Sequence, residues 1–172
     1  MSSDGARVLV VDDGIENLNL LTHILERAGF DVIAAPSAEV ALELVARQPI
    51  DLAILDIVMP GVDGLHLQQL LAAGNPQRPM PVIFISGRND AETIERAFDA
   101  GSVDYVTKPF KEREVVARVT HHLRLDRLQR ALEQQNTELA AANRKLAEQL
   151  AWREQAEEQL RCADDRLSLI ST

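Results

Sequence analysis

The chain has 172 residues, of which 46% are apolar and 26% charged, so a folded globular protein is expected rather than a disordered one. The net charge of −9 disfavours a basic clamp for DNA or RNA, and we expect no direct nucleic-acid binding. The single cysteine, Cys162, excludes an internal disulfide and a cysteine-based zinc site. No apolar run approaches about 18 residues, and residues 1–7 lack the basic start and long apolar stretch of a signal peptide. We therefore expect a cytoplasmic protein that does not contact the membrane. Four histidines lack partners spaced like metal ligands and are expected at the surface or in helices: His23, His66, His121 and His122.

Helix-breaking residues are confined to the first two thirds of the chain. The last glycine is Gly101 and the last proline is Pro109, so the 63 residues from Phe110 to Thr172 contain neither. We therefore expect a globular domain over residues 1–120 and a helical segment over residues 121–172. Because no Gly/Pro/Ser linker separates them, one helix is expected to cross the boundary.

Short apolar runs alternate with amphipathic segments through the expected globular domain. The run VLVV is continuous and β-branched, as expected for a strand buried on both faces. Gly29 ends the first amphipathic segment, and Ser37 is a candidate N-cap for the second. The predicted strands are 8–11, 31–35, 52–55, 81–85 and 103–107, and the predicted helices are 15–28, 38–48, 65–73, 90–100 and one that begins at 112. This alternation predicts an α/β fold with a parallel sheet covered on both faces.

Polar side chains stand where the predicted strands end, at the edge where parallel α/β sheets bind ligands. They are Asp12 and Asp13 after the first strand, Asp56 after the third, Ser86 after the fourth and Lys108 after the fifth. Three clustered carboxylates repel one another and need a proton or a cation, and oxygen donors suit Mg²⁺. A carboxylate beside a metal, with a lysine and a hydroxyl in reach, can act as a nucleophile on phosphorus.

The segments VLVVDD, LAILDIVMPGVDG, ISG and DYVTKPF carry a family resemblance, because they occur in this order at the predicted strand ends. Over about residues 6–120 the chain resembles the receiver domain of two-component response regulators. The resemblance implies a doubly wound five-stranded parallel sheet of order 2-1-3-4-5. It also implies that the phosphoryl donor is a histidine kinase, a phosphotransfer protein or a small phosphodonor. The domain would assist its own Mg²⁺-dependent phosphorylation and dephosphorylation without being an enzyme otherwise.

The resemblance also assigns roles to individual residues. Asp56 is the implied phosphoacceptor, and Lys108 is expected to contact the phosphoryl group and to precede a cis bond to Pro109. Ser86 is the implied switch hydroxyl and Tyr105 the implied aromatic switch. The implied Mg²⁺ ligands are Asp12, Asp13, Asp56 and the backbone carbonyl of Val58.

Other protein classes fit the sequence less well. A dehalogenase-like phosphatase places a second aspartate two residues after its nucleophile, where this chain has Val58. A Rossmann dehydrogenase needs a glycine-rich turn after the first strand, but DDGIEN has one glycine. In the resembled family, the positions of Val58 and Arg88 tune dephosphorylation, so the lifetime of the phosphoryl group is left open. A constitutive dimerisation scaffold that depends little on phosphorylation is the alternative function.

Leucines recur every seven residues in the helical segment, and this set is called the leucine stripe. Its members are Leu125, Leu132, Leu139, Leu146, Leu160 and Leu167, with Arg153 as the one interruption. Taken as heptad d positions, they place Gln129, Asn136, Asn143, Leu150, Glu157 and Asp164 at a. Such a repeat predicts a coiled coil, and asparagine at a favours a parallel homodimer. We also expect the natural chain to continue into an output domain of unspecified type.

Overall fold

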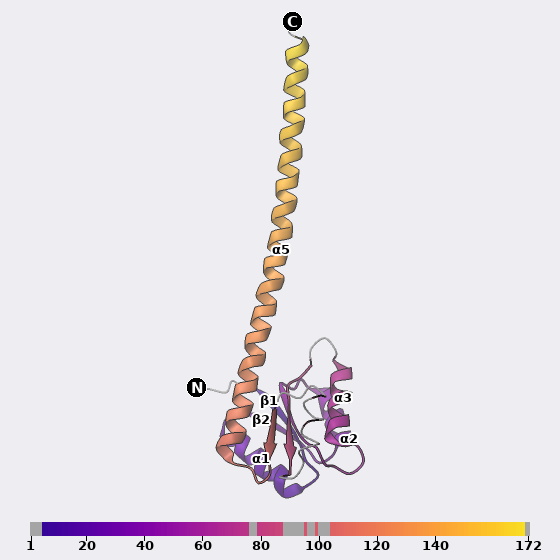
Figure 1. The fold of residues 1–172 in the computed structure, drawn as a ribbon, viewed down its shortest axis with the longest axis vertical. Coiled ribbons are helices and arrows are strands. Elements are labelled where there is room, and N and C mark those ends of the chain that lie inside the picture. The colour runs from indigo at the N-terminus through magenta and orange to yellow at the C-terminus, as the bar shows by residue number, and fades with distance from the viewer. Residues whose placement is uncertain (1–4, 76–78, 88–94, 96–98, 100–103, 171–172) are drawn as a thin grey trace. The chain divides into compact units, whose positions relative to one another are not determined.

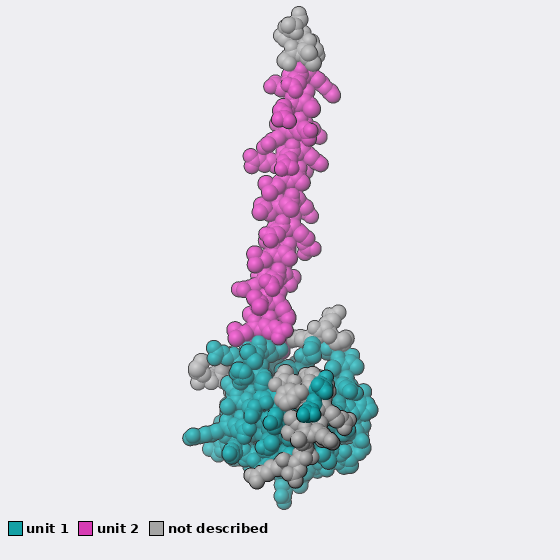
Figure 2. All heavy atoms as spheres, in the orientation of Figure 1, with its two compact units in different colours: residues 1–126 teal, residues 127–172 magenta. Residues whose placement is uncertain are grey.

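The computed structural model describes residues 5–75, 79–87, 95, 99 and 104–170, and for residues 167–170 it describes the backbone. The chain divides into two compact units, Met1–Asp126 and Arg127–Thr172, coloured separately in Figure 2. The helix expected at 90–100 lies outside the described residues apart from Glu95 and Asp99, which are helical. Arg88 also lies outside the described residues.

A parallel sheet forms the centre of the first unit (Figure 1). Its five strands are ordered β2-β1-β3-β4-β5. Its strands are β1 (Arg7–Val11), β2 (Asp31–Ala35), β3 (Leu52–Asp56), β4 (Val82–Ser86) and β5 (Asp104–Thr107). The predicted fold class and strand order are therefore confirmed. Because the strand order reverses between β1 and β3, the loops after these two strands diverge at the point where such sheets bind ligands.

The helices begin and end close to the predicted residues because local capping signals fix them. They are α1 (Ile15–Arg27), α2 (Ala38–Arg47), α3 (Gly64–Gly74) and α5 (Glu112–Ile170). The Ser37 hydroxyl accepts a hydrogen bond from Val40 N at 3.4 Å, which confirms the predicted N-cap. Asp63 Oδ1 caps α3 by accepting from His66 N at 2.7 Å. Gly29 follows α1 with φ of 90°, a conformation that glycine adopts without strain.

Two apolar clusters cover the two faces of the sheet. On one face, Val8 and Val10 of β1 pack with α1 and with the start of α5, where Val115, Val119 and Leu123 recur every four residues. On the other face, Leu9 and Val11 pack with α2 and α3. Alternate residues of β1 thus enter opposite clusters, as expected for a strand buried on both sides.

The second unit is one helical segment, and its described leucines are exposed in this single chain. The exposed fractions of Leu132, Leu139, Leu146 and Leu160 range from 54% to 71%. Polar pairs four residues apart run along the same helix, among them Gln129–Glu133 at 3.0 Å. In the part of the chain that the structure describes, no helix is long and apolar enough to span a bilayer.

Candidate functional site

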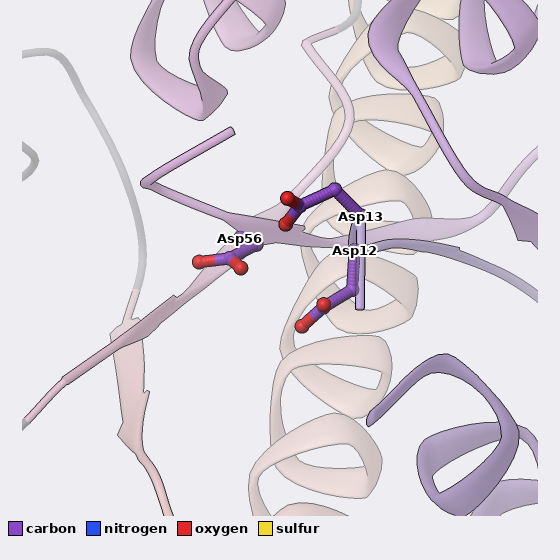
Figure 3. Close-up of side chains that lie close together, drawn as sticks. All are labelled: Asp12, Asp13 and Asp56. Carbon is purple, nitrogen blue, oxygen red and sulfur yellow. The ribbon is translucent and has the colours of Figure 1, made fainter. Parts of the chain in front are cut away.

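Three carboxylates gather at the carboxyl edge of the sheet, as Figure 3 shows. Asp12 and Asp13 follow β1, and Asp56 is the last residue of the neighbouring β3. One oxygen of each lies within 4.8 Å of the others. Asp12 is 1% exposed and Asp56 is 4% exposed, whereas Asp13 is exposed to solvent. Sequence reasoning predicted this juxtaposition, because parallel strands place their carboxyl ends at one edge.

Lys108 crosses the sheet edge from the loop after β5 and pairs with two of these carboxylates. Its Nζ lies 2.7 Å from Asp56 Oδ2 and 3.1 Å from Asp12 Oδ2. The bond between Lys108 and Pro109 is cis, as predicted. Lys108 N also donates to Ser86 O at 2.9 Å, which ties this loop to the end of β4. One ammonium therefore neutralises part of the charge of two buried carboxylates.

The first turn of α1 orients the Asp12 carboxylate. Its Oδ1 accepts from Gly14 N at 2.8 Å and from Asn17 Nδ2 at 3.4 Å. A Cβ atom on Gly14 would lie 3.0 Å from that same oxygen, so the turn leaves little room for a larger residue. The remaining oxygen, Oδ2, faces Lys108.

Gly64 at the start of α3 fits closely behind Asp56, and sequence reasoning did not identify this contact. A Cβ atom on Gly64 would lie 2.2 Å from the Asp56 carbonyl oxygen and 3.0 Å from Ile57 Cα. Gly64 N donates to Ile57 O at 3.0 Å. The segment GVDG shows a candidate capping aspartate followed by a glycine, but nothing in it states which backbone that glycine approaches.

Burial dominates the electrostatics of Asp56. It raises the pKa of the Asp56 carboxyl above its ordinary value, although the hydrogen bond and charge of Lys108 act in the opposite direction. Burial also disfavours the charged form of Lys108, but its hydrogen bond to Asp56 and its ion pair with Asp12 outweigh that cost and raise the pKa of the ammonium. Lys108 therefore stays protonated more readily than a free lysine, and it faces Asp56, whose carboxyl is costly to ionise.

Ser86 lies on β4, the neighbour of β3, and Tyr105 lies on β5, at the far side of β4. Ser86 is the last residue of β4, is 1% exposed, and its Oγ makes no hydrogen bond within the described residues. Tyr105 on β5 is half-buried and packs against the apolar cluster on the α2 and α3 side. Val58, two residues after Asp56, exposes its side chain and donates its N–H to Asp56 Oδ1 at 3.3 Å.

A second charged cluster, which sequence reasoning missed, links the start of β5 to α5. The Asp104 carboxylate accepts from Arg118 Nη1 at 2.7 and 2.6 Å and lies 3.0 Å from His122 Nε2. Burial favours the neutral carboxyl, but the hydrogen bonds from His122 and Arg118 outweigh it and lower the pKa of Asp104. All four histidines lie in helices, as expected; His23, His66 and His121 are also exposed, whereas His122 is partly buried in this cluster. The sequence could not predict these pairs, because Arg118 and His122 follow Asp104 by 14 and 18 residues and such separations are not typical of any local motif.

The comparison with known families decides the identity of the first unit. Residues 8–120 match the model of the response regulator receiver domain. The chain belongs to the response regulator receiver family. Receiver domains bind Mg²⁺ at their acidic pocket, and the described residues fit that ion, because three carboxylates gather there and all donors are oxygens.

Similar proteins agree with this identification. The chain is 40% identical to the heme response regulator HssR of Staphylococcus aureus (strain bovine RF122 / ET3-1) over 116 residues, which are 67% of this chain and 50% of that protein. NtrX from Brucella abortus has 31% identity and a TM-score of 0.71 over 77% of this chain and 29% of that chain. A putative response regulator from Chloroflexus aurantiacus J-10-fl has 31% identity and a TM-score of 0.66 over 70% of this chain and 98% of that chain. The chain thus spans about half the length of the curated relatives it matches.

Proposed function

We propose that this receiver accepts a phosphoryl group on Asp56 from a histidine kinase or a phosphotransfer protein, and passes the resulting state through a dimeric coiled coil to an output domain. The observation that carries this proposal is the position of Lys108 Nζ, 2.7 Å from Asp56 Oδ2 and 3.1 Å from Asp12 Oδ2. A fixed cation beside a buried carboxylate suits an acceptor whose negative charge increases when it is phosphorylated.

The proposed chemistry is a displacement at phosphorus. A carboxylate oxygen of Asp56 attacks the phosphoryl group, the P–N bond to the donor imidazole breaks, and that bond's electron pair stays on the imidazole nitrogen, which takes up a proton. Lys108 offsets the charge of the transferred group. Mg²⁺ held by Asp12, Asp13, Asp56 and the Val58 carbonyl would supply further positive charge.

The buried hydroxyl of Ser86 supports a switch on the sheet. Its Oγ makes no hydrogen bond within the described residues and lies at the end of β4, next to Asp56 on β3. A phosphoryl group on Asp56 would offer it an acceptor, and a move of Ser86 toward that group would let Tyr105 on the adjacent β5 turn inward. The start of α5 packs under the same strands through Val115 and Val119, so a change there can reach the helix.

The leucine stripe supports a parallel homodimer as the proposed route of transmission. A seven-residue repeat is kept from Leu125 to Leu167 with one interruption, and such a repeat is typical of helices that pair with a second helix of the same repeat. The described leucines of the second unit are exposed in the single chain, so pairing would remove apolar area from water.

Labelling of an Asp56→Asn variant tests the phosphoacceptor. The variant should lose acid-labile phosphorylation by a small phosphodonor in Mg²⁺, because an amide oxygen is a poor nucleophile. Asp63→Asn is the matched control, since Asp63 lies outside the pocket and asparagine also caps helices well. Labelling that persists in Asp56→Asn would move the acceptor to another residue.

Light scattering on Leu132→Ala/Leu139→Ala/Leu146→Ala tests the dimer. The variant should have the mass of one chain, because each buried leucine contributes about 2–5 kcal/mol relative to alanine. It should still accept phosphate, since the receiver core lies in the first unit. A two-chain mass would place the main contact elsewhere. The constitutive scaffold predicts the same oligomeric state and affinity with and without a phosphoryl mimic, whereas signalling through the coiled coil predicts a difference.

A further inference from the structure

The leucine stripe can pair with a second helix in two ways, because the residues three and four positions after each stripe residue lie beside it on the helix face. The plus-three column consists of Leu128, Gln135, Ala142, Gln149, Ala156 and Ala163, and the plus-four column consists of Gln129, Asn136, Asn143, Leu150, Glu157 and Asp164. A two-stranded coiled coil buries the stripe with one of these columns and leaves the other at the edge. The leucines are a positions if the plus-three column is buried, and d positions if the plus-four column is buried.

The two columns differ in chemistry. Four of the six plus-three residues are apolar, one leucine and three alanines, and none is charged. The plus-four column contains one leucine, and five of its six residues are polar or charged. Burying the plus-three column therefore removes more apolar surface from water and desolvates fewer polar groups.

Charge separates the two arrangements further. In a parallel dimer that buries the plus-four column, Glu157 and Asp164 would each face their own copy across the axis, with like charges in a desolvated seam. Glu157 Oε1 already accepts from Arg153 Nε at 2.9 Å, and both side chains are largely exposed. That ion pair can persist if Glu157 lies at the edge of the seam. There the Glu157 carboxylate also offsets the charge of Arg153, the one residue that interrupts the leucine stripe.

From these observations we infer that two copies of this chain pair in parallel through the leucine stripe and the plus-three column, with Asn136 and Asn143 at the edge of the seam. The inference rests on the proposed dimer and names which face is buried. In this register, residues at the edge of one helix face edge residues of the second copy. Glu138 faces Asn143 of the second copy and Lys145 faces Leu150 of the second copy, so these pairs bring no like charges together. This differs from the asparagine-centred register predicted from the leucine spacing.

Neighbouring cysteines in the full chain, each in a Cys162→Ser background, test the buried column. Ala142→Cys should form an interchain disulfide about tenfold faster than Asn143→Cys, because the bond needs Cβ atoms about 4 Å apart. Ala156→Cys and Glu157→Cys repeat the comparison two heptads later. Equal rates, or faster oxidation of the plus-four cysteines, would overturn the inference.

Mass measurements separate failure of the inference from failure of the dimer. A one-chain mass by light scattering would refute the proposed dimer and the inference with it. A two-chain mass with no crosslink from any of the four variants would refute the parallel, in-register arrangement. A two-chain mass with fast plus-four crosslinks would refute only the choice of column.

The fluorescence of Trp152, the single tryptophan, tests the buried column independently of any added cysteine. It is 75% exposed in one chain. With the plus-three column buried, Trp152 takes a position at the edge of the seam, whereas with the plus-four column buried it points away from the partner. We expect emission at shorter wavelength in the dimer than in the Leu132→Ala/Leu139→Ala/Leu146→Ala variant, and equal emission would count against the inference.

Discussion

Replacing Gly64 by alanine should displace the backbone of Asp56, the proposed phosphoacceptor, without changing a charged group. The added Cβ would lie 2.2 Å from the Asp56 carbonyl oxygen and 2.9 Å from its carbonyl carbon. Because real Cβ contacts are essentially never shorter than 3.0 Å, the start of α3 and the end of β3 would have to separate by about 0.8 Å. Both groups are backbone, so no side-chain rotation can relieve the contact.

The energetic cost follows from the balance of two effects. Overpacking of this kind costs about 1–3 kcal/mol or more. Alanine at a helical position gains at most about 1 kcal/mol over glycine. The contact is with backbone, so the overpacking cost should be about 3 kcal/mol or more. After subtracting the gain from alanine, we expect a net loss of about 2 kcal/mol or more in the free energy of unfolding. Phosphorylation should also slow, because the Asp56 backbone sets the position of the attacking carboxylate.

Gly74→Ala is the matched control for this experiment. Gly74 is the last residue of the same helix, and an added Cβ there meets nothing within 4 Å. Calorimetric unfolding should show a lower melting temperature for Gly64→Ala and an unchanged or higher one for Gly74→Ala. The rate of labelling by a small phosphodonor should fall only in the first variant. Equal melting temperatures and rates in the two variants would refute the close contact between α3 and Asp56.

Three other changes probe the metal site, a charged cluster and a helix cap. Asp13→Ala removes a proposed direct ligand of Mg²⁺. It should weaken Mg²⁺ binding at least about tenfold in a calorimetric titration, because losing even a residue that only supports a ligand lowers metal affinity about 10- to 100-fold. Unchanged affinity would mean that Asp13 does not bind the metal. Asp104→Asn should cost about 1–3 kcal/mol at pH 7, because Arg118 loses a charged partner. The pKa of Asp104 is lowered in the folded state, so its contribution to the free energy of unfolding is present above pH 3.8, the ordinary value, and is lost as the pH falls through the folded-state pKa. Urea titrations should therefore show that the stability difference between Asp104→Asn and the unchanged protein shrinks in acid. A difference that stays constant with pH would contradict the ionic origin. Ser37→Ala should cost about 0.5 kcal/mol in the same titrations, at the low end for an N-cap, since the bond to Val40 N is long at 3.4 Å; a loss near 2 kcal/mol would indicate a further role for the hydroxyl.

The acidic pocket of the receiver was predictable because its residues stand at strand ends. Parallel strands bring their carboxyl ends to one edge whatever their order, so Asp12, Asp56 and Lys108 could be placed together from their positions after apolar runs. The strand order itself came from the family resemblance, since hydrophobic periodicity does not state which strands are neighbours.

Local patterns were enough to predict the alternation of elements, the residues at the strand ends and the seven-residue leucine repeat, because periodicity, caps and helix breakers act between residues close in the chain. Tertiary structure alone decided the fit of Gly64 against the Asp56 carbonyl and the pairing of Asp104 with Arg118 and His122. Those contacts depend on how elements pack across space, to within a fraction of an ångström, and no local pattern encodes that distance.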